Sequence, residues 1–159
     1  MSMFSAFNIN ASGLTAQRYR MDIISENVAN ANTTRTADGT PYRRKTVVFA
    51  EKGSRANFNH VLHHLDFSHA LKQAVQSQGH TSKGVKVTGA FEDYETEMNM
   101  VYDPSHPDAD ENGYVTYPNV NIITEMTNMI DASRAYEANA TAFNASKSMT
   151  QQGLEIGRG

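Results

Sequence analysis

Residues 121–152 contain neither glycine nor proline, and apolar side chains recur along them with a helical period. The recurring positions are Ile122, Met129, Tyr136 and Phe143, seven residues apart, with Met126, Ser133 and Ala140 four residues after the first three. This a/d spacing is typical of a helix that packs along one face. Asn121 suits the N-cap of such a helix and Gly153 its C′ position. The segment predicts a helix of roughly 46 Å, whose apolar face needs a partner.

The N-terminal part of the chain predicts a second long helix. Residues 1–34 contain no proline and only one glycine, Gly13. Apolar residues again recur every seven positions, at Phe7, Leu14, Met21 and Val28, with Ile24 and Ala31 three residues beyond the last two. The pattern predicts a helix over about residues 5–31, roughly 40 Å long. The helix is then expected to end at the polar residues Asn30, Asn32, Thr33 and Thr34, because asparagine tolerates the left-handed C-cap conformation.

The middle of the chain predicts short strands. Runs rich in β-branched, aromatic or methionine residues predict four strands of one small sheet, at 46–49, 85–88, 98–102 and 114–117. Residues 54–82 form a polar insert, in which apolar spacing favours a helix over Phe58–Val75. The chain divides into an N-terminal helix (1–34), a β-rich middle region (35–117) with the insert at 54–82, and a C-terminal helix (118–159). The predicted fold class is mainly α with a small β-rich insert, and its terminal helices form an antiparallel coiled-coil-like pair.

Few large apolar residues are available for a core. Five Leu, seven Ile, ten Val and seven Phe make up about 18% of the 159 residues, below the roughly 20% at which a self-sufficient core becomes doubtful. The net charge of −3 argues against both disorder and a nucleic-acid partner. Two helices alone would leave much of each apolar stripe uncovered, so further copies are expected to cover the rest in a tube or filament. The alternative is an ordinary helical hairpin whose stripes form the core of a soluble domain.

No segment carries a complete catalytic or metal-binding motif. The histidines of the insert include a spacing that suits zinc on one helix face: His60, His63 and His64, followed by His69 and His80. No glutamate lies between the first three, so a polar loop is favoured. The absence of cysteine excludes disulfides and thiolate zinc sites. We expect no enzyme activity, no catalytic residue, no cofactor and no metal.

Two further motifs favour structural roles. The first half of a calcium loop is suggested by four residues, Asp108, Asp110, Asn112 and Gly113. Its twelfth position is Asn119 directly after Pro118, which favours a polar turn between strands instead. The only basic run is Tyr-Arg-Arg-Lys at 42–45. It could dock an acidic partner, but a solvated strand edge is favoured.

Two long segments resemble the flagellar rod and hook proteins. The first is Ser12-Gly-Leu-Thr-Ala-Gln-Arg18, followed by Ile24-Ser-Glu-Asn-Val-Ala-Asn-Ala-Asn-Thr-Thr-Arg-Thr36 and Gly39-Thr-Pro-Tyr-Arg-Arg44. In that family a helix ends in a similar Ala-Asn-x-x-Thr core. The second runs from Tyr117 to Asn139 and on through Phe143-Asn-Ala-Ser-Lys147. It resembles the C-terminal helix of the proximal-rod members, as do 103–110 and Gly113-Tyr-Val.

The resemblance implies a structural subunit of the bacterial flagellar basal-body rod, which builds an axial drive shaft from terminal helices and transmits torque. It implies a place in the periplasm and export by the flagellar type III apparatus without a cleaved signal peptide. Expected partners are further copies in a helical tube, the rod proteins FlgB, FlgF and FlgG, the adaptor FliE and the MS-ring. The alternatives are a soluble coiled-coil adaptor and a His-rich zinc-binding protein.

Two sets of residues are expected to serve assembly. The subunit packing surface is expected to comprise Leu14, Met21, Ile24, Val28, Ile122, Met126, Met129, Tyr136 and Phe143. The turn that leaves the first helix is expected to be shaped by Asn27, Asn30, Asn32 and Thr33. Each set has a plainer alternative, since the apolar nine could form an intrachain core and the polar four a simple C-cap.

Overall fold

The computed structural model describes residues 3–52 and 84–157. Its elements are helix α1 (Met3–Ala29), strands β1 (Lys45–Glu51), β2 (Val85–Glu92), β3 (Asn99–Tyr102) and β4 (Tyr114–Tyr117), and helix α4 (Ile122–Ile156). All four predicted strands and both predicted long helices are thereby confirmed within a few residues. The helix expected over Phe58–Val75 and the five histidines of the insert lie outside the described residues.

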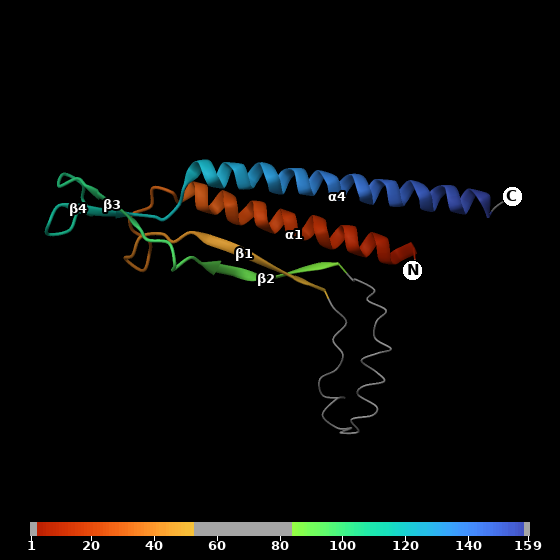
Figure 1. The fold of residues 1–159 in the computed structure, drawn as a ribbon, viewed down its shortest axis with the longest axis horizontal. Coiled ribbons are helices and arrows are strands. Elements are labelled where there is room, and N and C mark those ends of the chain that lie inside the picture. Colours follow the sequence, from red (N-terminus) through yellow and green to blue (C-terminus); the bar gives the residue numbers. More distant parts are fainter. Residues whose placement is uncertain (1–2, 53–83, 158–159) are drawn as a thin grey trace, which may run out of the picture.

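The two helices lie side by side and run in opposite directions (Figure 1). Helix α1 contacts α4 on one side and the β1–β2 pair on the other, so it forms the middle of the described structure. Strands β3 and β4 lie beyond the helix ends, at the end of the molecule opposite both termini (Figure 1). The protein is therefore mainly helical with a β insert, as expected.

Helix α4 begins as predicted but ends later. The Asn121 side chain caps its first turn, because Oδ1 accepts hydrogen bonds from the N–H groups of Ile123 and Thr124 at 3.0 and 3.2 Å. The prediction that Gly153 ends the helix is wrong, since α4 continues to Ile156 and Gly157 caps it. A Cβ at Gly153 would meet no atom within 4 Å, so the position is open. Only the entropy cost of an interior glycine, about 1 kcal/mol, opposes the helix there.

Helix α1 ends near the predicted residues by a different backbone geometry. The prediction of a left-handed asparagine is wrong, because among the described residues only glycines have positive φ. The chain instead tightens after Ala29, where Ala31 N–H donates to Val28 O and Thr33 N–H donates to Asn30 O. Such i→i−3 bonds satisfy carbonyls at a helix end without a left-handed residue.

The strands form two separate two-stranded sheets, which corrects the prediction of one small sheet. β1 and β2 are antiparallel from Lys45↔Glu92 to Glu51↔Val85, with a bulge between Val48 and Phe49. β3 and β4 are antiparallel from Asn99↔Tyr117 to Tyr102↔Tyr114. The chain turns between the sheets at Asp93, whose Oδ1 accepts hydrogen bonds from the N–H groups of Glu95 and Thr96. This turn ends β2 before the chain reaches β3.

The buried apolar core of the described residues is thin. Its side chains are mostly small: Ala16, Ile24, Ala31, Tyr42, Val115, Val120 and Ala132. At Gly84 the backbone approaches α1 so closely that no side chain fits between them. The φ of Gly84 is +99°, and a Cβ there would meet Ser12 Oγ at 2.1 Å. The same Oγ accepts a hydrogen bond from Val85 N–H at 3.0 Å, which ties the start of β2 to α1.

Candidate functional site

The line along which α1 and α4 approach each other is polar and small, not apolar. It follows four α4 residues spaced seven apart: Glu125, Ala132, Asn139 and Ser146. Glu125 accepts a hydrogen bond from Asn27 on α1, and Ser146 Oγ lies 3.5 Å from Asn10 Nδ2. A Cβ at Gly13 would meet Asn139 Oδ1 at 2.6 Å. The α4 residues that contact α1 thus lie beside the predicted apolar stripe of α4, and are not the stripe itself.

The structure divides the nine apolar residues expected at subunit contacts. On α1, Ile24 is buried and three are half-buried, namely Leu14, Met21 and Val28. On α4, two are half-buried, Met129 and Phe143. The Phe143 ring packs edge-to-face on Phe7 of α1 with 5.2 Å between centroids. The other three α4 residues are exposed, at 43% for Ile122, 58% for Met126 and 37% for Tyr136.

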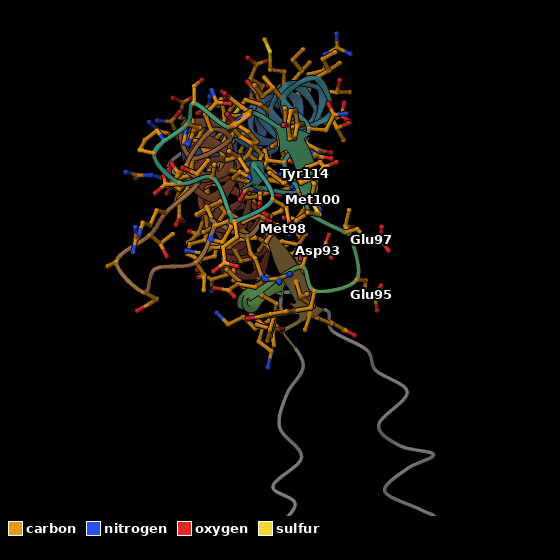
Figure 2. The ribbon with its side chains drawn as sticks, turned by 90° about the vertical axis from the view of Figure 1, so that its left-hand side faces the viewer. Asp93, Glu95, Glu97, Met98, Met100 and Tyr114 are labelled. Carbon is orange, nitrogen blue, oxygen red and sulfur yellow. The ribbon has the colours of Figure 1, made fainter. Side chains whose placement is uncertain are left out.

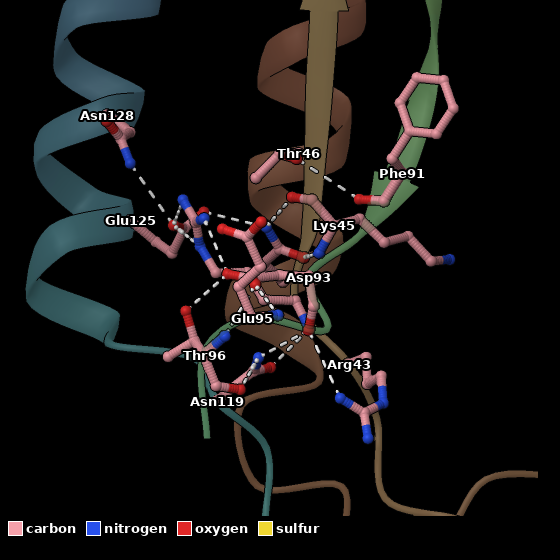
Figure 3. Close-up of polar contacts among 12 residues, drawn as sticks. Arg43, Lys45, Thr46, Phe91, Asp93, Glu95, Thr96, Asn119, Glu125 and Asn128 are labelled. Atoms are coloured by element: carbon pink, nitrogen blue, oxygen red, sulfur yellow. Dashed lines mark hydrogen bonds and ion pairs between the residues drawn. The ribbon is translucent and has the colours of Figure 1, made fainter. Parts of the chain in front are cut away.

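Glu125 is the centre of a buried polar cluster where the helices meet the strands (Figure 3). It lies in the first turn of α4 with 1% of its surface exposed. Its Oε1 accepts hydrogen bonds from Arg44 Nε at 2.9 Å and from Asn128 at 3.4 Å, and the Arg44 NH2 group lies 2.8 Å from it. Its Oε2 accepts from Asn27 Nδ2 at 3.0 Å. A buried carboxylate is stable only when it is paired and hydrogen-bonded in this way.

Asn27 joins α1 to the start of β1 from inside the same cluster. Its side chain is fully buried, and all its hydrogen-bonding capacity is used. Besides the bond to Glu125, Nδ2 donates to Lys45 O at 2.8 Å, and Oδ1 accepts from Lys45 N–H and the Tyr42 hydroxyl, both at 2.9 Å. Asn27 therefore holds β1 against α1. From the sequence, Asn27 was expected only to help shape the turn that leaves the first helix, because no local signal marks a buried asparagine.

The basic run at 42–45 is an internal part of this cluster, so the prediction of a solvated strand edge is wrong. Tyr42 is buried, and burial together with the carboxylates of Glu26, Glu125 and Glu92 raises its pKa to about 12. Arg44 pairs with Glu125, and the Lys45 ammonium pairs with Glu26 on α1. Arg43 lies with its guanidinium 4.4 Å from the centre of the Tyr94 ring. The acidic partners of the run are therefore supplied mainly by the chain's own helices.

Asn119 and Asp93 attach the loop between the two sheets to the cluster. Asn119 Oδ1 accepts a hydrogen bond from Arg44 N–H at 2.9 Å, and its Nδ2 donates to Asp93 O and Thr96 O. Hydrogen bonds from Thr96 hold the pKa of Asp93 below its usual value, with a smaller effect from the Arg44 charge. The carboxylate of Asp93 lies 3.9 Å from Arg44 Nη1. One buried cluster thus links both helices, β1 and the 93–96 loop.

The remaining predicted turn residues have separate roles. Asn30 Nδ2 donates to Glu26 O at 3.0 Å, and Thr33 Oγ1 donates to Asn30 Oδ1 at 3.1 Å, at the end of α1. Asn32 is exposed. The calcium-like segment is a polar turn between β3 and β4, as expected, with Asp110 Oδ1 accepting from Asn112 N–H. The described part of the chain places no group of three or more potential ligands to hold a metal, and none of its helices is long and apolar enough to cross a membrane.

Comparison with known proteins gives consistent matches. Residues 7–35 match the family model for flagella basal body rod proteins, and residues 111–156 match that for the C-terminal part of flagellar basal body rod FlgEFG proteins. The chain is 43% identical to the flagellar basal-body rod protein FlgC of Bacillus subtilis over 99% of this chain and the whole relative. Identity is 42% to FlgC of Borreliella burgdorferi over the full length of both chains. It is 36% to FlgC of Salmonella typhimurium over 99% of this chain and the whole relative.

Proposed function

Because this chain belongs to the FlgC family of flagellar basal-body rod proteins and is a structural subunit of the rod, not an enzyme, we propose how it assembles. Its terminal helices pack, in a coiled-coil-like manner, against neighbouring subunits to form the axial drive shaft, and the shaft transmits torque. The comparisons give no support to a zinc-binding protein or a soluble coiled-coil adaptor.

The observation that carries this proposal is an uncovered apolar patch at the start of α4. It consists of Ile122, Ile123, Met126 and Ile130, which are 43%, 77%, 58% and 53% exposed. Single exposed apolar residues are ordinary, but four on one side of two helical turns mark an interaction surface. Helix α4 uses its polar line to contact α1, which leaves these larger side chains free to pack on another subunit.

The buried cluster around Glu125 suits a subunit under torsion. A load applied to the helices reaches the strands through Asn27, Arg44 and Asn119, each of which makes more than one hydrogen bond. Because Asn27, Asn119 and Glu125 are buried, hydrogen bonds to their side chains compete little with water and hold one geometry. The cluster therefore couples the helices stiffly to the β3–β4 end.

Family membership supports the rest of the proposal. The subunits in contact are further copies of this chain, the rod proteins FlgB, FlgF and FlgG, the adaptor FliE and the MS-ring. The chain reaches the rod, in the periplasm, through the flagellar type III export apparatus without a cleaved signal peptide. The residues that pack between subunits are the exposed members of the predicted set, Ile122, Met126 and Tyr136, together with Ile123 and Ile130.

The test places charges on the apolar patch. Met126→Asp with Ile130→Asp should abolish swimming and rod assembly in a strain that lacks the natural gene, because an unpaired carboxylate buried in a contact costs several kcal/mol. The purified variant should unfold at the same urea concentration as the parent, since both positions are exposed. A control, Ala138→Asp with Ala142→Asp, adds the same charges at exposed positions of α4 two or more turns beyond the patch and should swim normally. Normal swimming of the first variant, or equal loss in the control, would refute the patch as an interface.

A further inference from the structure

The charges of this chain are strongly segregated. Residues 87–133 contain ten acidic residues and neither lysine nor arginine. Residues 1–52 contain seven basic and four acidic residues. The acidic segment includes both β3 and β4, which form the end of the molecule beyond the helices (Figure 1). Residues 93–119, which include β3 and β4, hold seven acidic residues, and only Arg35, Arg43 and Arg44 of the first 52 residues contact this segment by ion pair or ring stacking in the described structure, so acidic side chains outnumber basic ones at this end.

Part of that acidic charge has no partner in the described chain. Arg44 pairs with both Asp93 and Glu125, and Arg35 lies 3.6 Å from Asp108. Glu95 and Glu97 are exposed, and neither forms an ion pair within the described residues. Figure 2 looks onto this end of the molecule and shows both side chains on the loop that leads from Asp93 to β3.

An apolar strip lies next to these two carboxylates. On one face of the β3–β4 pair, Val115 of β4 is fully buried, whereas its partner Val101 on β3 is 48% exposed. On the alternate positions, Met100, Tyr102 and Tyr114 are 62%, 63% and 42% exposed. The two tyrosine rings pack edge-to-face with 5.2 Å between centroids, which holds them as one surface. We call Glu95, Glu97, Met100, Tyr102 and Tyr114 the hairpin surface.

The negative charge of the hairpin surface favours a partner with a basic surface. Two hairpin surfaces would repel each other, since like charges brought together at a contact are destabilising. A symmetric contact is thereby disfavoured, and a head-to-tail contact with a basic surface is favoured. Aromatic and methionine side chains beside the carboxylates suit a partner that also presents an aromatic ring.

The same chain carries such a basic surface on α1. Between Met3 and Met21 its only charged residues are Arg18 and Arg20, and Tyr19 between them is 37% exposed. The described residues form no ion pair with either arginine. Within one chain the two surfaces cannot meet, because the hairpin lies beyond Ala29 (Figure 1) and the nine residues from Arg20 to Ala29 span about 14 Å of helix.

We propose that the hairpin surface of one copy docks on Arg18, Tyr19 and Arg20 of α1 in a second copy. Glu95 and Glu97 face the two arginines, and Met100 and the tyrosine pair pack against Tyr19. Each copy uses one surface to hold the next copy and leaves the other surface available, so the same contact can repeat from copy to copy. This inference rests on the proposed rod function and adds to it the pair of surfaces that joins successive copies.

Crosslinking tests the contact directly, because the chain has no cysteine of its own. Isolated basal bodies that contain Tyr19→Cys with Met100→Cys should give a ladder of covalent multimers with a short bismaleimide crosslinker. Each single variant should remain monomeric. The control pairs Met100→Cys with Met149→Cys, which is 69% exposed near the other end of α4, and should give no ladder. Dimers from Met100→Cys alone, no ladder from the test pair, or an equal ladder from the control would each overturn the proposal.

A charge exchange separates this inference from the rod function itself. Glu95→Arg with Glu97→Arg should reduce swimming to the level of a strain that lacks the gene, and so should Arg18→Glu with Arg20→Glu. The four changes combined should restore swimming and the crosslinked ladder. If the strain without the gene swims, the rod function fails. If that strain is immotile but both charge reversals swim normally, or the combination does not recover, the rod function stands and the docking of copies by these surfaces is refuted.

Discussion

Removing the charge of Arg44 isolates the energetic role of the buried cluster. Arg44→Met keeps an unbranched apolar stem but leaves the carboxylate of Glu125, 1% exposed, without its charged partner. Glu125 would lose the contacts at 2.8 and 2.9 Å and keep only the amide donors of Asn27 and Asn128. Breaking a buried ion pair by removing one partner costs about 3–5 kcal/mol.

This loss of stability in Arg44→Met can be measured as a shift of the urea concentration at the unfolding midpoint. With a denaturant slope of roughly 2 kcal/mol per molar urea for a domain of this size, the midpoint should fall by about 1.5–2.5 M. The assay is urea unfolding of the purified chain at pH 7, followed by circular dichroism of the helices. The far-ultraviolet signal suits this purpose because α1 and α4 make up most of the described regular structure.

The double variant Arg44→Met with Glu125→Leu supplies the decisive comparison. Replacing both charges by apolar groups removes the unpaired carboxylate, and such replacements are often close to neutral in free energy. Asn27 would still donate to Lys45 O and accept from Tyr42, so the start of β1 remains attached. The double variant should therefore unfold at a higher urea concentration than Arg44→Met alone, even if the single variant shows no folded baseline. Equal midpoints for the single and double variants would refute the reasoning.

Two other changes probe the backbone and the buried tyrosine. Gly84→Ala should lower the free energy of unfolding by about 3 kcal/mol, because the added methyl group would clash with Ser12 and the backbone of Ile9 at a position that already has a positive φ. Gly39→Ala should lower it by only about 1–2 kcal/mol, because Gly39 has a φ of +77° but no neighbour within 4 Å. Equal losses for the two variants would contradict this reasoning. The pKa of Tyr42 is raised to about 12 in the folded chain from about 10 in the unfolded one. The protonated Tyr42 hydroxyl therefore contributes fully to the free energy of unfolding below about pH 10, and this contribution is lost as the pH rises to about 12. Between pH 9 and pH 12, the urea midpoint should fall more steeply with pH for the natural chain than for Tyr42→Phe, measured at pH 9, 11 and 12. An identical dependence on pH in the two chains would exclude Tyr42 as the group that titrates.

Local features of the fold could be predicted because they depend on nearby residues. The period of apolar residues in 121–152 and the Asn121 cap predicted α4, and β-branched runs predicted the four strands. The end of α4 was misplaced because glycine opposes a helix only weakly where nothing else terminates it. The separation into two sheets was missed because it depends on the turn at Asp93, whose side chain bonds its own loop.

The sequence by itself determined two long helices, four strands and membership of a rod protein family, since periodicity and long co-linear motifs are properties of the chain alone. Only the tertiary structure decided which line of α4 faces α1. Asn27 and Glu125 are 98 positions apart, and their contact depends on the rotation and register of two helices. The same geometry turned the basic run at 42–45 inward onto carboxylates of α1 and α4, because burying Glu125 at the helix contact requires a cation beside it.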